Sequence, residues 1–294
     1  MRAFTLESFE AQPALRDDLP EPSVGDNELL VHVHASSVNP VDVFIAAGGL
    51  KEMAEHEFPV TLGRDFAGVV NEVGPSVSRY QVGDEVFGFV LHANPTVHEG
   101  SWAGRIIVPE DNQVAAKPPA LDFAHAAAAP VAAIAALAAF DPLALGGDES
   151  VLVVGAPGGV GSFFVQLAAA AGAKVIAPAL PEDRDYLHGL GVREVVDRDM
   201  RREGVDAILD VVSPTPDASL LKEGGRLAST LGAAGEGPGR FSIMGEPTPA
   251  NPPAPRRTPG RAHYGFRSNA ATTWNKRVRR SKSCPPRTRR ARSA

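Results

Sequence analysis

The feature that most constrains the fold is a glycine-rich loop between an apolar run and a helical stretch. The run Val151–Val154 has the composition of a strand covered on both faces, and Phe163–Ala171 has that of a helix. A strand, a glycine loop and a helix N-terminus in this order form the pyrophosphate site of Rossmann folds, because small residues let the phosphates reach free backbone N–H groups. The order therefore predicts a dinucleotide site. Its residues are Gly155, Ala156, Gly158, Gly159, Val160 and Gly161.

Individual positions of this loop have different expected roles. Gly158 lets the backbone approach the phosphates, and Gly161 permits close packing of the helix on the strand. Ala156 stands where the common fingerprint has its first glycine, so the surrounding strand and helix carry more of the prediction than the motif itself. A glycine-rich turn that binds nothing is the alternative interpretation.

The residues after the second strand bear on the choice of cofactor. An NAD site usually has an acidic residue at the end of that strand, where it bonds the ribose 2′-hydroxyl. Here the strand Ala173–Ala177 is followed by Pro178 and Ala179, so no carboxylate would repel a 2′-phosphate. Arg184 is either the partner of that phosphate or a solvated surface charge. The sequence favours NADPH over NADH.

Strand and helix signals divide the chain into two folded parts. Residues 1–118 contain short β-rich runs separated by glycine turns, which predicts a small barrel-like β domain. Residues 119–251 begin with alanine-rich helical sequence and then alternate strands with helices, which predicts an α/β domain with a doubly wound parallel sheet. The alanine-rich stretch, Ala124–Phe140, is interrupted by Pro130 and predicts a buried helix pair rather than a membrane span. The predicted strands of the sheet are Val151–Val154, Ala173–Ala177, Glu194–Val196, Ala207–Val212, Arg226–Leu231 and Phe241–Met244.

The last part of the chain, residues 252–294, differs in composition from the rest. It contains 13 lysines and arginines and no acidic residue, whereas the first 251 residues carry a net charge of −19. It has no helical or strand periodicity, so we expect it to be disordered. The acidic body gives no electrostatic reason to bind nucleic acid or an anionic membrane, although the tail alone would.

Cysteine content and the N-terminal sequence bear on cellular location. Cys284 is the one cysteine, so neither a disulfide framework nor a cysteine-based zinc site can form within one chain. The first residues turn acidic and lack the apolar core of a signal peptide. We expect a cytoplasmic protein that acts on a small molecule and has no membrane partner. A homodimer is one possible oligomeric state.

Three segments together carry a family resemblance. They are residues 37–42 (SVNPVD), residues 62–70 (LGRDFAGVV) and the glycine loop. In order and spacing they resemble the medium-chain dehydrogenase/reductase superfamily in its quinone oxidoreductase, zeta-crystallin-like branch. The resemblance implies a GroES-like catalytic domain over residues 1–118 followed by a Rossmann domain over residues 119–251.

The resemblance also implies functional residues. Asn39 and Asp42 would line the cleft near the nicotinamide ribose and the substrate, and Gly232 would lie near the nicotinamide. In zinc-dependent members the positions of Asn39 and Arg64 carry a cysteine and a histidine that bind the metal, so no zinc is expected here. Without that Lewis acid, reduction of a quinone or an α,β-unsaturated carbonyl is favoured over alcohol oxidation.

Two departures from the family pattern leave the proton donor unassigned. Phe44 falls where many relatives have tyrosine, and Ala135 lies near a position where many have threonine. The substrate proton would then come from water.

The tail gives the alternative hypotheses. Relatives continue beyond residue 251 with a helix and closing strands that return to the first domain, whereas this chain becomes basic and proline-rich at Pro252. Either the segment results from a reading-frame change, or the chain is a catalytically impaired family member whose tail binds nucleic acid or an anionic surface.

Overall fold

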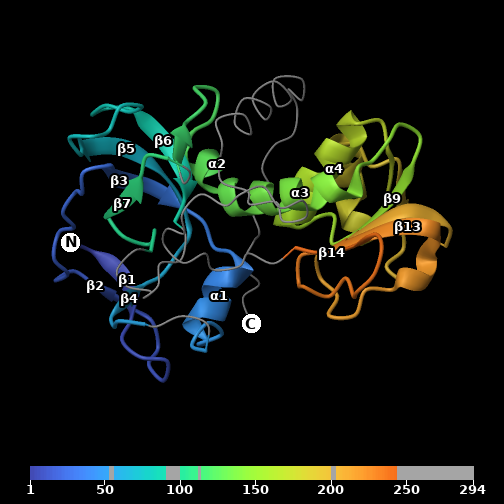
Figure 1. Ribbon diagram of the computed structural model, residues 1–294, viewed down its shortest axis with the longest axis horizontal. Coiled ribbons are helices and arrows are strands. Elements are labelled where there is room, and N and C mark those ends of the chain that lie inside the picture. Colours follow the sequence, from blue (N-terminus) through green and yellow to red (C-terminus); the bar gives the residue numbers. More distant parts are fainter. Residues whose placement is uncertain (53–55, 91–99, 112–113, 200–202, 244–294) are drawn as a thin grey trace. The chain divides into compact units, whose positions relative to one another are not determined.

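The computed structural model describes residues 1–243 except 53–55, 91–99, 112–113 and 200–202 (Figure 1). The predictions for residues 244–294, including the disordered tail, its partners and the frame change, lie outside the described residues. The chain forms two compact units, and the boundary between them follows Ile134. No helix in the described ranges is both long enough and apolar enough to cross a membrane.

The first unit is built on two antiparallel sheets. One has the strand order β7-β3-β5-β6-β8 and the other has the order β2-β1-β4. The larger sheet packs its apolar side chains into a core that includes Leu29, Val31, Phe66 and Val108, all fully buried. The elements are β1 (Ala3–Leu6), β2 (Ala14–Arg16), β3 (Glu28–Ser36), α1 (Pro40–Ala46), β4 (Val60–Thr61), β5 (Asp65–Val73), β6 (Glu85–Phe89), β7 (Arg105–Pro109), β8 (Val114–Ala116) and α2 (Phe123–Ala127).

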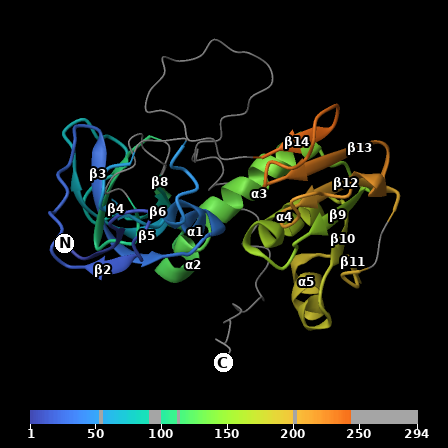
Figure 2. The same cartoon turned by 90° about the horizontal axis from the view of Figure 1, so that it is seen from below.

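The second unit is a six-stranded, all-parallel sheet with the order β11-β10-β9-β12-β13-β14. Numbered along the chain from β9, this order is 3-2-1-4-5-6, which is the doubly wound arrangement of dinucleotide-binding folds (Figure 2). The predicted α/β class and parallel sheet are confirmed. The strands are β9 (Ser150–Val154), β10 (Lys174–Pro178), β11 (Glu194–Val196), β12 (Val205–Asp210), β13 (Leu221–Ser229) and β14 (Arg240–Ser242).

Alternate residues of these strands enter two different cores. Val151, Val153 and Val175 pack against α3 (Pro130–Leu143), α4 (Gly159–Ala170) and α5 (Arg184–Leu190) on one face. Leu152 and Ile208 point to the other face, where the described cover is the short 3₁₀ helix η2 (Ala218–Leu220) and neighbouring loop residues. In the described chain, helices connect β9 to β10 and β10 to β11, whereas η2 and turns connect β12, β13 and β14.

Each predicted strand of the parallel sheet is found, with bounds that shift by one or two residues in β9, β10, β12 and β14 and by more in β13. The alanine-rich stretch forms α2 and α3, as predicted for a helix pair. The helix α4 begins at Gly159, earlier than the predicted Phe163, because the last glycines of the loop form its first turn. The strand β13 begins at Leu221 rather than Arg226, because Leu221 pairs with Val205 across a register shift.

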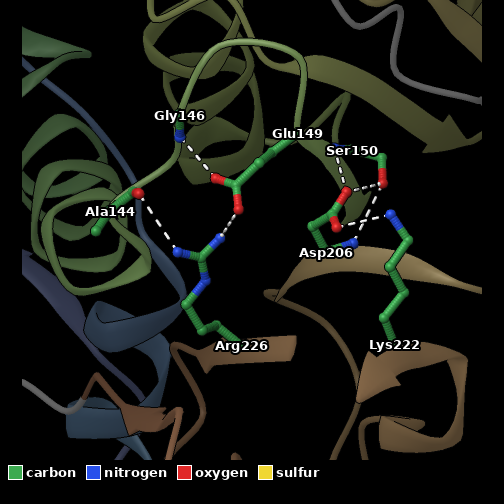
Figure 3. Close-up of polar contacts among 7 residues, drawn as sticks. All are labelled: Ala144, Gly146, Glu149, Ser150, Asp206, Lys222 and Arg226. Carbon is green, nitrogen blue, oxygen red and sulfur yellow. Dashed lines mark hydrogen bonds and ion pairs between the residues drawn. The ribbon is translucent and has the colours of Figure 1, made fainter. Parts of the chain in front are cut away.

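Paired charges join the amino-terminal ends of the parallel strands. Asp206 at the start of β12 accepts hydrogen bonds from Ser150 N at 2.8 Å, Ser150 Oγ at 2.6 Å and Lys222 Nζ at 2.7 Å (Figure 3). Lys222 and the two Ser150 donors lower the pKa of the Asp206 carboxyl below its usual range. We call Asp206, Ser150 and Lys222 the Asp206 cluster. Beside it, Arg226 Nη2 donates to Glu149 Oε1 at 2.6 Å (Figure 3).

Candidate cofactor site and active site

The glycine loop turns sharply between β9 and α4. Gly155 has a φ of +92°, which an L side chain rarely adopts, and its carbonyl accepts a hydrogen bond from Gly158 N at 3.0 Å. A Cβ on Gly161 would lie 2.2 Å from Gly155 O, whereas a Cβ on Gly158 would lie 3.3 Å from the same atom. Gly161 therefore brings the helix against the loop, and a side chain at Gly158 would meet a milder contact with the same carbonyl.

The N-terminus of α4 offers hydrogen-bond donors beside this loop. Gly158 is its N-cap residue and provides no side-chain cap. Helix geometry leaves the backbone N–H groups of the next three residues, Gly159, Val160 and Gly161, without intrahelical partners, and the helix dipole is positive at this end. Ala156 is fully buried, so its methyl group packs inward and stays off the open surface. These residues fit a pyrophosphate group, which needs small side chains and free amide donors.

A cavity of about 250 Å³ opens beside the carboxyl ends of β9, β10 and β12. Ligands of doubly wound sheets bind at this edge. Asp210, which is 3% exposed, shapes one wall because its Oδ1 accepts from Val212 N at 3.0 Å and from Ser213 N at 2.8 Å. The lining residues are Leu152, Val154, Pro178, Arg198, Asp199, Ile208, Asp210, Ser213, Thr215, Asp217 and Leu220.

Two arginines of this unit are placed differently with respect to the cavity. Arg184 is the first residue of α5, is exposed and does not line the cavity. Arg198 does line it, two residues beyond β11, whose last residue Val196 pairs with Pro178. Neither guanidinium forms a hydrogen bond or an ion pair with another described residue. Arg198 was not predicted from the sequence, although its place just after a predicted strand was a usable signal.

Gly232 follows β13 and has a φ of +71°, a conformation that favours glycine. It lies next to Leu231, whose side chain is exposed. Its expected place near the nicotinamide stays a prediction.

The first unit brings Asn39 and Asp42 together at the start of α1. Asn39 is the N-cap residue, and its backbone N donates to Asp42 Oδ2 at 2.6 Å, as in a capping box. Asp42 is 1% exposed, and its other oxygen, Oδ1, has no hydrogen-bond partner in the described part of the chain. Burial raises the pKa of Asp42, and the Asn39 hydrogen bond and the nearby Arg64 charge partly offset that effect.

Asp65 lies in the same polar region and is fully buried. Its Oδ2 accepts from Ser37 Oγ at 2.7 Å and from Asn39 Nδ2 at 2.9 Å, and its Oδ1 accepts from Val131 N at 2.8 Å. All three donors come from segments that are distant from Asp65 in the sequence. Burial raises the pKa of Asp65 to about 6 against the opposing effect of these three donors. We call Asp65, Ser37, Asn39 and Val131 the Asp65 cluster.

Arg64 is also buried, at 3% exposure, and its Nη1 donates to Val90 O at 3.5 Å. Its positive charge stands where zinc-dependent relatives would have a metal ligand, and a guanidinium does not coordinate cations. Among the residues that the structure describes, no group of three histidine, cysteine or acidic side chains could hold a metal ion.

The geometry agrees with comparisons to known proteins. Residues 25–119 match the alcohol dehydrogenase GroES-like domain. A crystal structure of an alcohol dehydrogenase superfamily protein from Novosphingobium aromaticivorans superposes with a TM-score of 0.71 at 32% identity, covering 81% of this chain and 74% of that one. The chain belongs to the medium-chain dehydrogenase/reductase superfamily. The predicted resemblance and the GroES-like and Rossmann fold class are therefore confirmed.

Other members of the superfamily narrow the branch. The quinone oxidoreductase from Coxiella burnetii superposes with a TM-score of 0.68 at 29% identity, covering 78% of this chain and 75% of that one. A chloroplastic quinone-oxidoreductase homolog from Spinacia oleracea is 35% identical over 61% of this chain and 54% of its own length. The mitochondrial NAD(P)H oxidoreductase RTN4IP1 of Mus musculus is 36% identical over 58% of this chain and 46% of its own length. The chain thus spans about half the length of these curated relatives.

Proposed function

We propose that this protein is an NADPH-dependent oxidoreductase that reduces a quinone or an α,β-unsaturated carbonyl without zinc. The observation that carries the proposal is the glycine loop: its close contact between Gly161 and Gly155 and its free amides fit a pyrophosphate within a doubly wound sheet. Relatives named quinone oxidoreductase and NAD(P)H oxidoreductase, and a structural neighbour named enoyl reductase, support this reaction class.

In this proposal some residues bind the cofactor, and others hold the start of α1 in place. A bound nicotinamide would supply hydride to an electrophilic acceptor. The loop and the first turn of α4 bind the pyrophosphate, and the cavity lined by Pro178 and Arg198 receives the adenosine half. Asn39 and Asp42 fix the start of α1 beside the acceptor. Water supplies the substrate proton, since no hydroxyl side chain is assigned to that step.

Choice of NADPH rests on charge at the end of β10. Pro178 and Ala179 provide no carboxylate there, and Arg198 lines the cavity without an ion-pair partner in the described chain. A guanidinium pairs well with a phosphate through two parallel hydrogen bonds. Arg184 is the second candidate for this contact. The homodimer and the cytoplasmic location stay part of the proposal.

Cofactor titration tests the core of the proposal. Purified protein is titrated with NADPH and with NADH while nicotinamide fluorescence is recorded. Gly161→Ala should weaken binding about 100-fold or more, equal to about 3 kcal/mol, because its methyl group collides with Gly155 O. Gly147→Ala is the matched control, since nothing lies within 4 Å of its added Cβ. If the wild-type protein binds neither cofactor, the proposal fails.

A second titration assigns the phosphate contact. Arg198→Met should weaken NADPH binding about 10- to 100-fold, as expected for the loss of charge-assisted hydrogen bonds, and leave NADH binding within about twofold. Arg184→Met is run beside it. If Arg184→Met alone changes the preference for NADPH, the contact belongs to α5. Turnover against a panel of quinones and enones then identifies the acceptor class.

A further inference from the structure

One buried carboxylate joins three separate segments of the first unit. Asp65 at the start of β5 receives hydrogen bonds from Ser37, from Asn39 and from the backbone of Val131 at the start of α3. These donors are 28, 26 and 66 residues away along the chain. The carboxylate therefore holds together a loop, a helix N-terminus and a strand that local sequence does not connect.

The same contacts fix the side chain of Asn39. Its two amide protons are both used, because Nδ2 donates to Ser37 Oγ at 3.0 Å and to Asp65 Oδ2 at 2.9 Å. An ionised carboxylate only accepts hydrogen bonds, so it compels the amide to turn its nitrogen inward. The capping box turns the amide oxygen toward the first turn of α1. Asn39 thus has no proton left for the oxygen of a substrate, and it acts by shaping the loop that carries Asp42.

We infer that Asp65 is a positioning residue of the proposed active site, which holds the Ser37–Asn39 loop and the start of α3 in their working arrangement only while it is ionised. The inference rests on the proposed function for its catalytic consequence. A protonated Asp65 would become a donor at one oxygen and could no longer accept from both Ser37 Oγ and Asn39 Nδ2. Either the Ser37 hydroxyl or the Asn39 amide would then have to give up its hydrogen bond to Oδ2, and the loop would rearrange.

The surroundings of Asp65 place this change within an accessible pH range. Of the groups that face it in the described chain, Asp42 on α1 is the ionisable one, and its charge raises the pKa of Asp65 further. Ser37, Asn39 and Val131 contribute neutral donors that lower it, and the first turn of α3 carries no acidic side chain. The guanidinium of Arg64 bonds Val90 O. The pKa of about 6 means that the arrangement is lost as the pH falls through that value.

Trp102 gives a direct readout of this loop in the free protein. Its indole Nε1 donates to Ser37 O at 2.8 Å. The chain has two tryptophans, so Trp274→Phe leaves Trp102 as the sole emitter. In that background, tryptophan fluorescence should titrate with a midpoint near pH 6. Asp65→Asn, which has the same shape without the titrating proton, should abolish the transition.

Activity supplies the second readout. The kcat/KM of the wild-type protein should fall below about pH 6. Asp65→Asn should lower kcat/KM about 10- to 100-fold at neutral pH, the range expected when a supporting contact is misplaced, and should remove the acid limb. Its affinity for NADPH should stay within about twofold, because the glycine loop lies in the other unit.

Ser37→Ala keeps the test decisive if Asp65→Asn fails to fold. Loss of the Ser37 hydrogen bond removes an effect that lowers the pKa of Asp65, so both the fluorescence midpoint and the acid limb should move above pH 6. Unchanged midpoints in both variants would overturn the inference. A wild-type protein that binds no nicotinamide cofactor would overturn the proposed function instead, and the fluorescence titration would still decide the role of Asp65.

Discussion

The carboxylates of the Asp65 cluster and the Asp206 cluster each accept three hydrogen bonds, yet their pKa values shift in opposite directions. In each cluster a serine hydroxyl and a backbone N–H are among the donors. The third donor is the neutral Asn39 amide in one case and the Lys222 ammonium in the other. The pKa rises to about 6 at Asp65 and falls at Asp206.

The difference shows that the number of hydrogen bonds does not set the proton affinity of these groups. Asp65 is fully buried without a cation, so desolvation of its charged form outweighs its three donors. Asp206 retains 23% of its side-chain exposure and pairs with a cation, so its charged form is favoured. The carboxylate of the Asp65 cluster therefore changes its protonation near pH 6. The carboxylate of the Asp206 cluster stays ionised at neutral pH and stabilises the sheet there.

The largest expected effect is the pH dependence of stability that Asp65 causes. Its folded-state pKa lies above the unfolded value of 3.8, so the folded protein binds the proton more tightly between pH 4 and 6 and loses stability as the pH rises through that window. The change should amount to about 2–3 kcal/mol. Urea denaturation of wild type and Asp65→Asn at pH 4, 5, 6 and 7 measures it. Parallel curves for the two proteins would contradict the assignment.

Asp206 should give the free energy of unfolding the opposite dependence on pH, with a smaller change than Asp65 gives. Its folded-state pKa lies below 3.8, so its contribution is complete above about pH 4 and is lost as the pH falls further. Asp206→Asn should lower the free energy of unfolding by about 1–2 kcal/mol at pH 7 and by less at pH 3. Chemical denaturation at both pH values provides the measurement, and NADPH affinity should not change. A loss that is as large at pH 3 as at pH 7 would rule out this origin.

Matched serine variants sharpen the comparison further. Ser37→Ala and Ser150→Ala each remove one hydroxyl donor from a carboxylate, at a cost of about 1 kcal/mol at pH 7. They should differ in function, because only Ser37→Ala should shift the fluorescence transition of Trp102. Thermal unfolding and the fluorescence titration are measured on the same samples. A transition shifted by Ser150→Ala would break the distinction between the clusters.

The smallest expected effect belongs to Lys222. Its side chain is 52% exposed, so solvent screens the pair with Asp206 at 2.7 Å. Lys222→Met should cost less than about 1 kcal/mol at low salt and almost nothing at 1 M NaCl. Denaturation curves at the two salt concentrations test this. A cost that persists in high salt would mean that the side chain contributes through packing instead.

The buried parallel strands and the turn before α4 could be predicted from the local sequence. Apolar runs such as Val151–Val154 predicted the buried parallel strands, and the glycine loop predicted where the sheet meets α4. Both predictions succeed because a buried strand and a tight turn each limit which residue types can occur within a short stretch of sequence.

The Asp65 cluster shows what such patterns miss. Its contacts depend on tertiary packing that places Ser37 and Val131 beside Asp65, and no periodicity links positions so far apart. Arg198 was missed for a related reason, since the parallel pairing of β10 with β11 brings it to the cavity. Arg184 was the predicted contact because it lies a few residues after the second strand in the sequence.

The connections between strands differ along the parallel sheet, and this difference affects how easily each part of the sheet unfolds locally. Helices α4 and α5 cover the links among β9, β10 and β11, whereas η2 and turns link β12, β13 and β14 in the described chain. Backbone amides under thin cover are released by smaller local fluctuations than amides beneath packed helices. Deuterium from the solvent should therefore enter β13 and β14 well before it enters β9 and β10.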